Sequence, residues 1–250
     1  MRLSPWLGLL RSLAIYYHPA RLAEMRRFYR GLLAPDDLAF DIGAHVGNRS
    51  RAMRAAGARV VALEPQPVFA SFLRASLPRD ITLHEAAAGP VESEAEMALS
   101  SRHPTVSSLS ARFPEEAAAR PGFGHVRWDR RQRVRVTTLD RLIAQAGVPR
   151  YIKIDVEGFE IEVLAGLSVP VEIISAEYLP GFPALSHAVI DRLCALGPYR
   201  FNVVVGEAAG FLWPDWRGAE ALRAWLAGLP ADATSGDIFA RLVAPEAVAA

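Results

Sequence analysis

Leu38-Ala-Phe-Asp-Ile-Gly-Ala-His-Val-Gly47 is the stretch of sequence that decides the fold. An apolar run leads to Asp41, and two glycines follow in Gly-x-x-x-Gly spacing. About twenty residues later a second apolar run, 59–63, ends in Glu64. In open α/β sheets a glycine turn lets the backbone approach a nucleoside, and an acid at the next strand end binds the ribose hydroxyls. The stretch therefore predicts a nucleoside-binding α/β fold.

The glycine turn discriminates between two kinds of nucleoside ligand. Its spacing departs from the Gly-x-Gly-x-x-Gly fingerprint of dinucleotide sites, and Asp41 adds a carboxylate that would repel a pyrophosphate. A ligand with a cationic amino-acid tail would instead be attracted, and S-adenosylmethionine is such a ligand. The turn therefore favours a site for this cofactor over a dinucleotide-dependent oxidoreductase.

The composition is that of a globular enzyme with one main domain. With 250 residues, 51% of them hydrophobic, the chain can bury a sizeable core. Its formal net charge of +1 gives no case for nucleic-acid binding. The single cysteine, Cys194, excludes an internal disulfide and a cysteine-based zinc cluster, and we expect a buried core thiol.

An apolar segment precedes the nucleoside-binding pattern. Residues 6–17 are interrupted by Arg11, are too short to span a bilayer and lack a clear small-x-small cleavage site. We interpret them as an amphipathic helix packed on the domain edge, with a helix at the membrane surface as the alternative. Residues 21–33 indicate a second helix. We expect a helical extension over 1–35, a main domain over 36–250 and a cytoplasmic protein without a transmembrane segment.

From residue 36 onward, apolar runs of strand length alternate with helical patterns. The predicted strands are 38–42, 59–63, 81–85, 151–155, 171–177, 200–205 and 238–243. The predicted helices are 48–56, 68–76, 140–146, 159–165, 185–196 and 220–229. This order predicts an α/β fold with a seven-stranded, mostly parallel sheet, helices on both faces and an antiparallel last strand.

Residues 90–132 interrupt this alternation with a segment rich in Ser, Pro, Arg and Glu. Such a long insertion is unusual, and this one follows the third strand, at the sheet edge where such folds bind ligands. We expect the insertion to cover the pocket, with His103, His125, Trp128 and the arginines of the insertion as candidate substrate contacts. A surface hairpin that touches no ligand is an equal alternative.

The second informative stretch is Tyr151-Ile-Lys-Ile-Asp-Val-Glu-Gly158. Charged residues in a buried strand are costly unless paired, and Lys153 and Asp155 share a face because strand side chains alternate. Two acids and a lysine at one strand tip predict a coupled polar site beside the Asp41 turn. A local ion pair with a carboxylate that caps the next helix is the structural alternative.

Five ordered blocks of sequence resemble the FkbM family of S-adenosylmethionine-dependent methyltransferases. They are Phe-Asp-Ile-Gly-Ala-His-Val-Gly, Val-Val-Ala-Leu-Glu-Pro-Gln-Pro, Ala-Ala-x-Gly, Val-Thr-Thr-Leu-Asp-Arg-Leu-Ile and Ile-Lys-Ile-Asp-Val-Glu-Gly-Phe-Glu-Ile-Glu-Val-Leu-x-Gly. The resemblance covers residues 36–178, extends loosely to 235–240, and departs from the family at His45, where Asn is more frequent. It implies a class I methyltransferase (Rossmann-like) fold and O-methylation of a hydroxyl on a sugar, surface glycan or natural product.

The resemblance also implies roles for individual residues. The residues expected to hold the methionine end of the cofactor are Asp41, Gly43, Ala44, His45 and Gly47. Those expected around the ribose and the adenine are Glu64, Pro65, Gln66, Ala86 and Ala87. The strand-tip acids that would contact the cofactor or take a proton from the acceptor hydroxyl are Asp155, Glu157 and Glu177.

Several alternatives stay open. A divalent metal held by Asp155, Glu157 and a histidine of the insertion would replace the metal-free reaction that we expect. A cofactor-binding module without catalysis and an N-methyltransferase are the competing functions, although no Asn/Asp-Pro-Pro-Tyr type of amine-binding turn follows residue 154. The acceptor is expected to be a small molecule or a glycan, its identity is not encoded in these motifs, and a homo-oligomer is compatible with the sequence.

Overall fold

The computed structural model describes residues 5–100, 107–110, 113–118 and 126–243. Its centre is a seven-stranded sheet with the strand order β3-β2-β1-β7-β8-β10-β9. The strands are β1 (Leu38–Ile42), β2 (Arg59–Leu63), β3 (Ile81–His84), β7 (Tyr151–Ile154), β8 (Ile173–Tyr178), β9 (Tyr199–Val205) and β10 (Gly236–Leu242). Strand β10 is antiparallel to both neighbours and the other pairs are parallel. The predicted sheet, including its antiparallel last strand, is confirmed.

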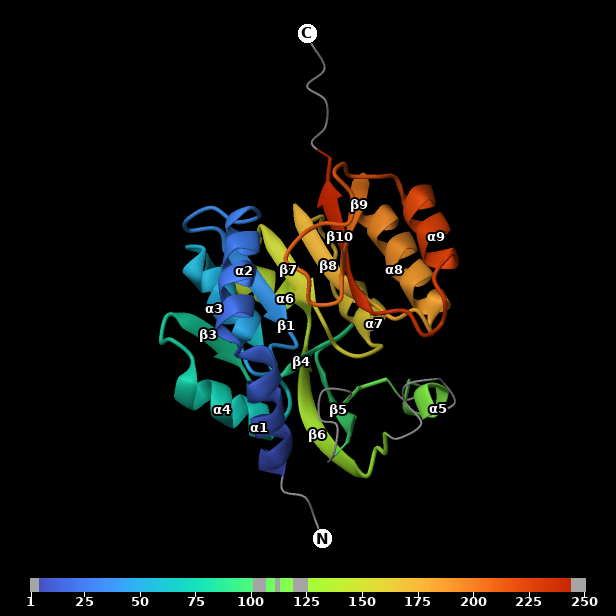
Figure 1. Cartoon of the computed structure of the whole chain (residues 1–250). Helices are drawn as coiled ribbons and strands as arrows, with labels where there is room; N and C mark the ends of the chain where they lie inside the picture. Colours follow the sequence, from blue (N-terminus) through green and yellow to red (C-terminus); the bar gives the residue numbers. More distant parts are fainter. Residues whose placement is uncertain (1–4, 101–106, 111–112, 119–125, 244–250) are drawn as a thin grey trace.

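Helices cover both faces of this sheet (Figure 1). One layer is formed by α6 (Leu139–Ala146), α7 (Glu160–Ala165), α8 (Pro183–Leu196) and α9 (Ala219–Ala227). The other is formed by α2 (Pro19–Arg30), α3 (Asn48–Ala55) and α4 (Pro67–Ser76). Side chains alternate along β1 between the two layers. Phe40 and Ile42 belong to the first hydrophobic cluster, between the sheet and the layer of α6 to α9, and Ala39 belongs to the second cluster, between the sheet and the layer of α2 to α4.

One sequence prediction about the core is wrong. Cys194 is exposed, whereas we expected it to be a buried thiol. The buried side of α8 is formed by Ser186, Val189, Ile190 and Leu193, in helical spacing. Cys194 follows Ile190 by four residues and lies at the margin of this buried side, in the last turn of α8, where its side chain is exposed.

The N-terminal segment forms two helices that pack on the main fold. In α1 (Pro5–Tyr16), Leu9 packs with Val46 and Phe69, and the hydroxyl of the following Tyr17 donates to the carbonyl oxygen of Val46 at 2.8 Å. Helix α2 buries Met25 and Tyr29 in the second cluster. Among the described residues, no helix is long and apolar enough to cross a membrane.

The insertion is built on a second, smaller sheet with the order β4-β6-β5. Its strands are β4 (Ala87–Ala88), β5 (Ser93–Leu99) and β6 (Arg130–Thr137), and a short helix, α5 (Phe113–Ala118), lies between β5 and β6 in the chain. Strands β5 and β6 pair antiparallel, and β4 pairs parallel with β6. Figure 1 shows this sheet near the carboxyl ends of β1 and β7. The insertion therefore stands at the edge of the main sheet where ligands bind in such folds.

Candidate active site

A cavity with about 710 Å³ of empty space lies at the carboxyl ends of β1, β2 and β7. The strand ends, the segment Ala86–Ala88, the insertion and the end of α1 all contribute to its walls. The predicted cofactor contacts that line it are Gly43, His45, Glu64, Pro65, Gln66, Ala86, Ala87 and Asp155.

Three predicted cofactor contacts do not line this cavity. Asp41 is buried, with 1% of its surface exposed, and accepts a hydrogen bond from the Ser50 hydroxyl of α3. Burial raises the pKa of its carboxyl group above the ordinary value. Ala44 packs in the core, and Gly47 precedes α3. Asp41 thus fastens α3 to β1, and a contact with the cofactor stays a prediction.

The glycine turn permits a close approach between two strand ends. Gly43 has a φ of 86°, and a Cβ added there would lie 1.9 Å from the backbone oxygen of Asp155. Gly47 has a φ of 75°, and an added Cβ would lie 2.7 Å from Leu73 Cδ2. Side chains are rare at positive φ, and neither position has room for one. Glycine at position 43 therefore sets the distance between the β1 turn and the β7 tip, and glycine at position 47 sets the distance between this turn and α4.

His45 lies in the same turn at a φ of 51°, which is uncommon for a residue other than glycine. Its ring is packed edge-on against Tyr16 and Phe69, with centroid distances of 5.5 and 4.3 Å. Its Nε2 is buried without a hydrogen-bond partner in the described structure. Burial lowers the pKa of the imidazole to about 4, so His45 presents a neutral ring to the cavity.

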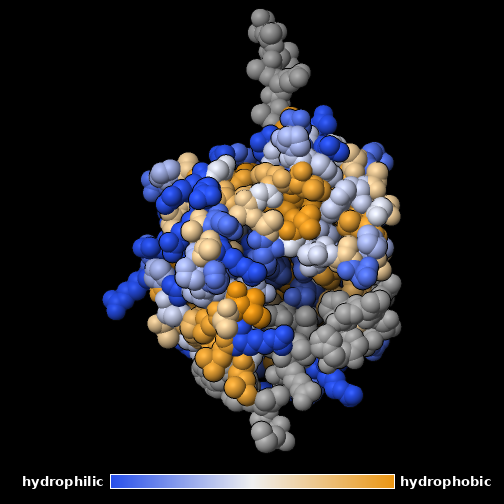
Figure 2. Space-filling model, in the orientation of Figure 1, coloured by the Kyte–Doolittle hydropathy of each residue, from blue (hydrophilic) through white to orange (hydrophobic). Residues whose placement is uncertain are grey.

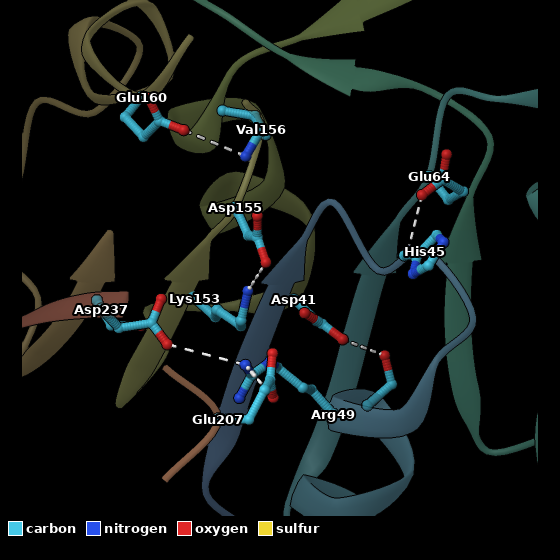
Figure 3. A network of polar contacts seen from close by, with 12 residues as sticks. Asp41, His45, Arg49, Glu64, Lys153, Asp155, Val156, Glu160, Glu207 and Asp237 are labelled. Carbon is cyan, nitrogen blue, oxygen red and sulfur yellow. Dashed lines mark hydrogen bonds and ion pairs between the residues drawn. The ribbon is translucent and has the colours of Figure 1, made fainter. Parts of the chain in front are cut away.

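Glu64, at the end of β2, is the most constrained acid of the cavity wall. Only 3% of its surface is exposed. Its Oε2 accepts the backbone N–H of His45 and its Oε1 accepts that of Gln66, each at 2.8 Å. Burial raises the pKa of this carboxyl group to about 8, against the opposing effect of these hydrogen bonds. Two backbone amides therefore hold the carboxyl group in one orientation against the cavity, and Figure 3 shows the bond from His45.

The tip of β7 contains the predicted coupled pair. Lys153 is buried, with 1% exposed, and its Nζ donates to Asp155 Oδ2 at 2.6 Å (Figure 3). Although burial acts to raise the pKa of Asp155, the Lys153 ammonium holds it below the ordinary value. The backbone amides after Asp155 are bound by Glu160, whose Oε1 accepts from Val156 N at 3.3 Å and Gly158 N at 3.2 Å. The local ion pair therefore exists, but no carboxylate caps α7 (Glu160–Ala165), and Glu160 instead holds two amides of the turn before that helix.

The structure brings together the three acids predicted for catalysis. Asp155, Glu157 and Glu177 each place a carboxylate oxygen within 4.8 Å of the others. Strands β7 and β8 are parallel neighbours, so their carboxyl ends meet at one edge. Burial, followed by the charge of the neighbouring acids, raises the pKa of Glu157 and of Glu177 well above the ordinary value. Asp155 and Glu157 line the cavity, and Glu177 Oε2 is buried without a hydrogen-bond partner in the described structure.

A second polar group was missed by the sequence analysis. Arg49, in the first turn of α3, lies 3.0 Å from Glu207 Oε2 and 4.0 Å from Asp237 Oδ2 (Figure 3). These three residues and Tyr16 line a smaller cavity, and Tyr16 also lines the first one. The only sequence signal was the loose resemblance over 235–240, which contains Asp237. Nothing in the sequence indicated that α1 would place Tyr16 between the two cavities.

The insertion contributes Met97, Ser107 and Leu109 to the wall of the larger cavity. Trp128 is partly buried and packs against a cluster that contains Phe113 and Phe182, and its contact with substrate stays a prediction. The other expected contacts, His103 and His125, lie outside the described residues. The hairpin therefore touches the cavity, and its role in acceptor binding stays a prediction.

Comparisons with solved structures found similar chains of low sequence identity. Precorrin-6y C5,15-methyltransferase from Geobacter metallireducens GS-15 matches with a TM-score of 0.45 and 16% identity, over 90% of this chain and 85% of that chain. An O-methyltransferase from Bacillus cereus, solved in complex with SAH, matches with a TM-score of 0.44 and 13% identity, over 94% and 90%. A search of curated protein sequences found no match.

A family profile gives the decisive comparison. The profile described as the methyltransferase FkbM domain matches residues 41–229, which is more than half of the chain. This range contains the glycine turn, Glu64 and the acids at the tips of β7 and β8. The sheet order and its antiparallel β10 are those of a class I methyltransferase fold. The chain therefore belongs to the FkbM methyltransferase family.

Proposed function

We propose that this protein is an S-adenosylmethionine-dependent O-methyltransferase whose cofactor binds in the larger cavity. Membership of the FkbM family supports methyl transfer. The observation that carries the cofactor assignment is Glu64, a buried carboxyl group at the end of β2 that lines the cavity. Ribose hydroxyls are hydrogen-bond donors, and a carboxylate at this place in an open α/β sheet accepts them.

The rest of the cavity fits the two ends of the same cofactor. Apolar surface for an adenine is provided by Ala86, Ala87, Met97 and Leu109, all of which line the cavity. Another part of the cavity wall is polar, with the carboxyl groups of Asp155 and Glu157. These groups suit the sulfonium and the ammonium group of the amino-acid tail, which are positively charged. When bound, the cofactor supplies a methyl group on a positively charged sulfur.

The strand-tip acids supply the proton acceptor for the reaction. As the methyl group of a bound cofactor is transferred from sulfur to the acceptor oxygen, the hydroxyl proton of the acceptor would pass to a carboxylate of the strand tips. Lys153 keeps Asp155 ionised and weakly basic, whereas the raised pKa of Glu157 and Glu177 makes their carboxylates stronger bases. Glu157 lines the cavity, so it is our candidate for the base, with Asp155 positioned by Lys153 beside it.

The smaller cavity favours a hydroxylated acceptor. Tyr16 belongs to both cavities, and the smaller one is lined by Arg49, Glu207 and Asp237. Guanidinium and carboxylate groups bind several hydroxyls at once, as a sugar or glycan presents them.

Calorimetric titration with S-adenosylhomocysteine tests the cofactor site. Removing the charge-assisted bond in Glu64→Ala should weaken binding about 10- to 100-fold, and Glu64→Gln, which retains an acceptor oxygen, should weaken it less. The matched control is Glu85→Ala, because Glu85 follows the neighbouring strand but is bound to Arg74 at the exposed surface. Unchanged affinity in Glu64→Ala, or tight binding of a nicotinamide dinucleotide by the wild type, would refute the assignment.

A methyl-transfer screen tests the reaction itself. Labelled S-adenosylmethionine is offered with hydroxylated sugars, glycolipids and primary amines, and transfer is followed by mass spectrometry. We expect a methyl ether on a hydroxylated acceptor. Transfer to amines alone would make the protein an N-methyltransferase, and tight cofactor binding with no transfer in the whole panel would favour a module without catalysis.

A further inference from the structure

Helix α1 has an outer face of exposed apolar side chains. Leu7, Leu10 and Ile15 are 50%, 61% and 43% exposed, in the spacing of one side of a helix. They are three of the nine large apolar residues exposed in the described part of the chain, and the others are scattered over the fold. Figure 2 shows hydrophobic residues gathered over the region that α1 occupies in Figure 1. The inner side of α1, with Leu9, is already packed against the fold.

Positive charge is concentrated in the same N-terminal segment. Residues 1–33 contain six arginines and a single acid, Glu24, for a net charge of +5. The remaining chain has 22 basic and 26 acidic residues, for a net charge of −4. The arginines of this segment that are exposed are Arg11, Arg21, Arg26, Arg27 and Arg30. None of these five forms an ion pair with another residue that the structure describes.

We propose that the outer face of α1, together with the arginines of α1 and α2, docks on an anionic lipid bilayer. A helix with an apolar face and adjacent basic residues lies in the membrane interface, with the apolar side chains among the acyl chains and the cations among the headgroups. Each basic residue near an anionic bilayer adds attraction that salt screens. Docking of this kind is peripheral, and the finding that no described helix can span a membrane is compatible with it.

Charge and symmetry argue against a second copy of this chain as the occupant of this face. A two-fold dimer brings the same patch of both subunits together, so Arg11 would face Arg11 and the arginines of α2 would repel their counterparts. The apolar contribution is also small, since three partly exposed side chains lie far below the roughly 800 Å² per partner of a stable interface. An anionic surface satisfies both the apolar and the cationic groups.

The position of α1 gives this docking a consequence for the cavities. Tyr16, at the carboxyl end of α1, lines both cavities and packs against His45. The helix that contacts the bilayer therefore also contributes to the proposed site. A hydroxylated acceptor held at a membrane surface would meet the site without leaving that surface. This extension rests on the proposed function, whereas the proposal that α1 docks on a bilayer does not.

Sedimentation with lipid vesicles tests the docking without any assay of methyl transfer. The full-length protein is mixed with vesicles of phosphatidylcholine alone, or of phosphatidylcholine with phosphatidylglycerol, at low and high salt. We expect binding to the anionic vesicles, weaker binding to the neutral ones, and a loss of binding as salt increases. Binding that is absent from anionic vesicles, or equal for both compositions, would overturn the proposal.

Three double variants separate the apolar and the electrostatic contributions. Leu7→Ser with Leu10→Ser should weaken partitioning about 100-fold, and Arg27→Gln with Arg30→Gln about 30-fold. The matched control replaces two equally exposed valines elsewhere, Val91→Ser with Val148→Ser, and should bind like the wild type. All substituted side chains are exposed, and circular dichroism with thermal melting verifies the fold.

Two results would exclude the bilayer as the partner. Vesicle binding that depends on salt but not on the two leucines would indicate attraction to any polyanion, without insertion of α1. A protein that sediments with no vesicle, forms dimers by light scattering and becomes monomeric in the leucine variant would show that a second copy covers this face. Either result would overturn the proposal while leaving the proposed methyltransferase function untouched.

Discussion

The raised pKa of Glu64 predicts that nucleoside affinity depends on pH. Burial places this pKa at about 8 in the ligand-free protein, so at pH 6 only about 1% of the molecules have an ionised Glu64. Ribose hydroxyls donate hydrogen bonds and therefore prefer the ionised carboxylate. Affinity should then increase as the pH rises from 6 and level off above about 9, the direction expected when binding releases a proton.

The size of this pH effect on affinity is limited by the difference between the hydrogen bonds that neutral and ionised Glu64 can accept. A neutral hydrogen bond contributes about 0.5–1.5 kcal/mol and one to a charged group about 1.5–3 kcal/mol, so ionisation adds about 1–2 kcal/mol. This corresponds to an increase of about 5- to 30-fold in affinity between pH 6 and 9. His45 does not contribute in this window, because its pKa is lowered to about 4.

Calorimetry with 5′-methylthioadenosine measures this dependence directly. This nucleoside contains the ribose and adenine of the cofactor and lacks the amino-acid tail, so no group of the ligand titrates in the window. Wild type should show the increase, and Glu64→Gln should show weak binding that is constant with pH. A flat wild-type profile, or a Glu64→Gln variant with an unchanged slope, would refute the role of Glu64; the slope in the variant would then belong to another acid of the wall, such as Glu157.

Three further predictions concern the strand ends. Gly43→Ala should lower the free energy of unfolding, measured by urea unfolding, by about 3 kcal/mol or more, because the new Cβ would lie 1.9 Å from Asp155 O. The control is Gly210→Ala, where an added Cβ meets nothing within 4 Å, and it should change the free energy of unfolding by less than about 0.5 kcal/mol. Asp155→Asn and Glu157→Gln should each lower kcat about 100-fold or more. Glu157→Gln should cost about 1 kcal/mol of stability, whereas Asp155→Asn should cost about 3 kcal/mol because it leaves the buried Lys153 without its ion-pair partner. Early melting with full turnover per folded molecule would mark either residue as structural. A chelator should leave turnover unchanged, and a loss that Mg²⁺ restores would place a metal among Asp155, Glu157 and Glu177.

The sheet could be predicted because its strands are short apolar runs between clear turn signals. Each predicted strand of the main sheet differs from the observed one by at most a few residues, as with 171–177 against Ile173–Tyr178. The meeting of Asp155 and Glu177 also follows from sequence, because parallel neighbours end at the same edge. Local pattern and strand alternation were sufficient for these features.

The rest of the site depends on packing between distant segments. The ion pair of Arg49 with Asp237 joins α3 to β10, and the position of Tyr16 depends on how α1 packs near Phe69. No local pattern encodes such contacts. Asp41 shows a second limit of sequence reasoning. Side chains alternate along β1, so Asp41 points to the same face of the sheet as Ala39, toward α3. The resemblance to the family implied a cofactor contact for Asp41 and did not take this direction into account.

The central claim is that the cavity at the ends of β1, β2 and β7 binds S-adenosylmethionine, and a crystal structure with S-adenosylhomocysteine tests it most directly. The account predicts density in this cavity, with the ribose hydroxyls bound to Glu64 and the amino-acid end near Gly43 and Asp155. Density for the nucleoside at another place in the fold, with Glu64 contacting only the amides of His45 and Gln66, would contradict it.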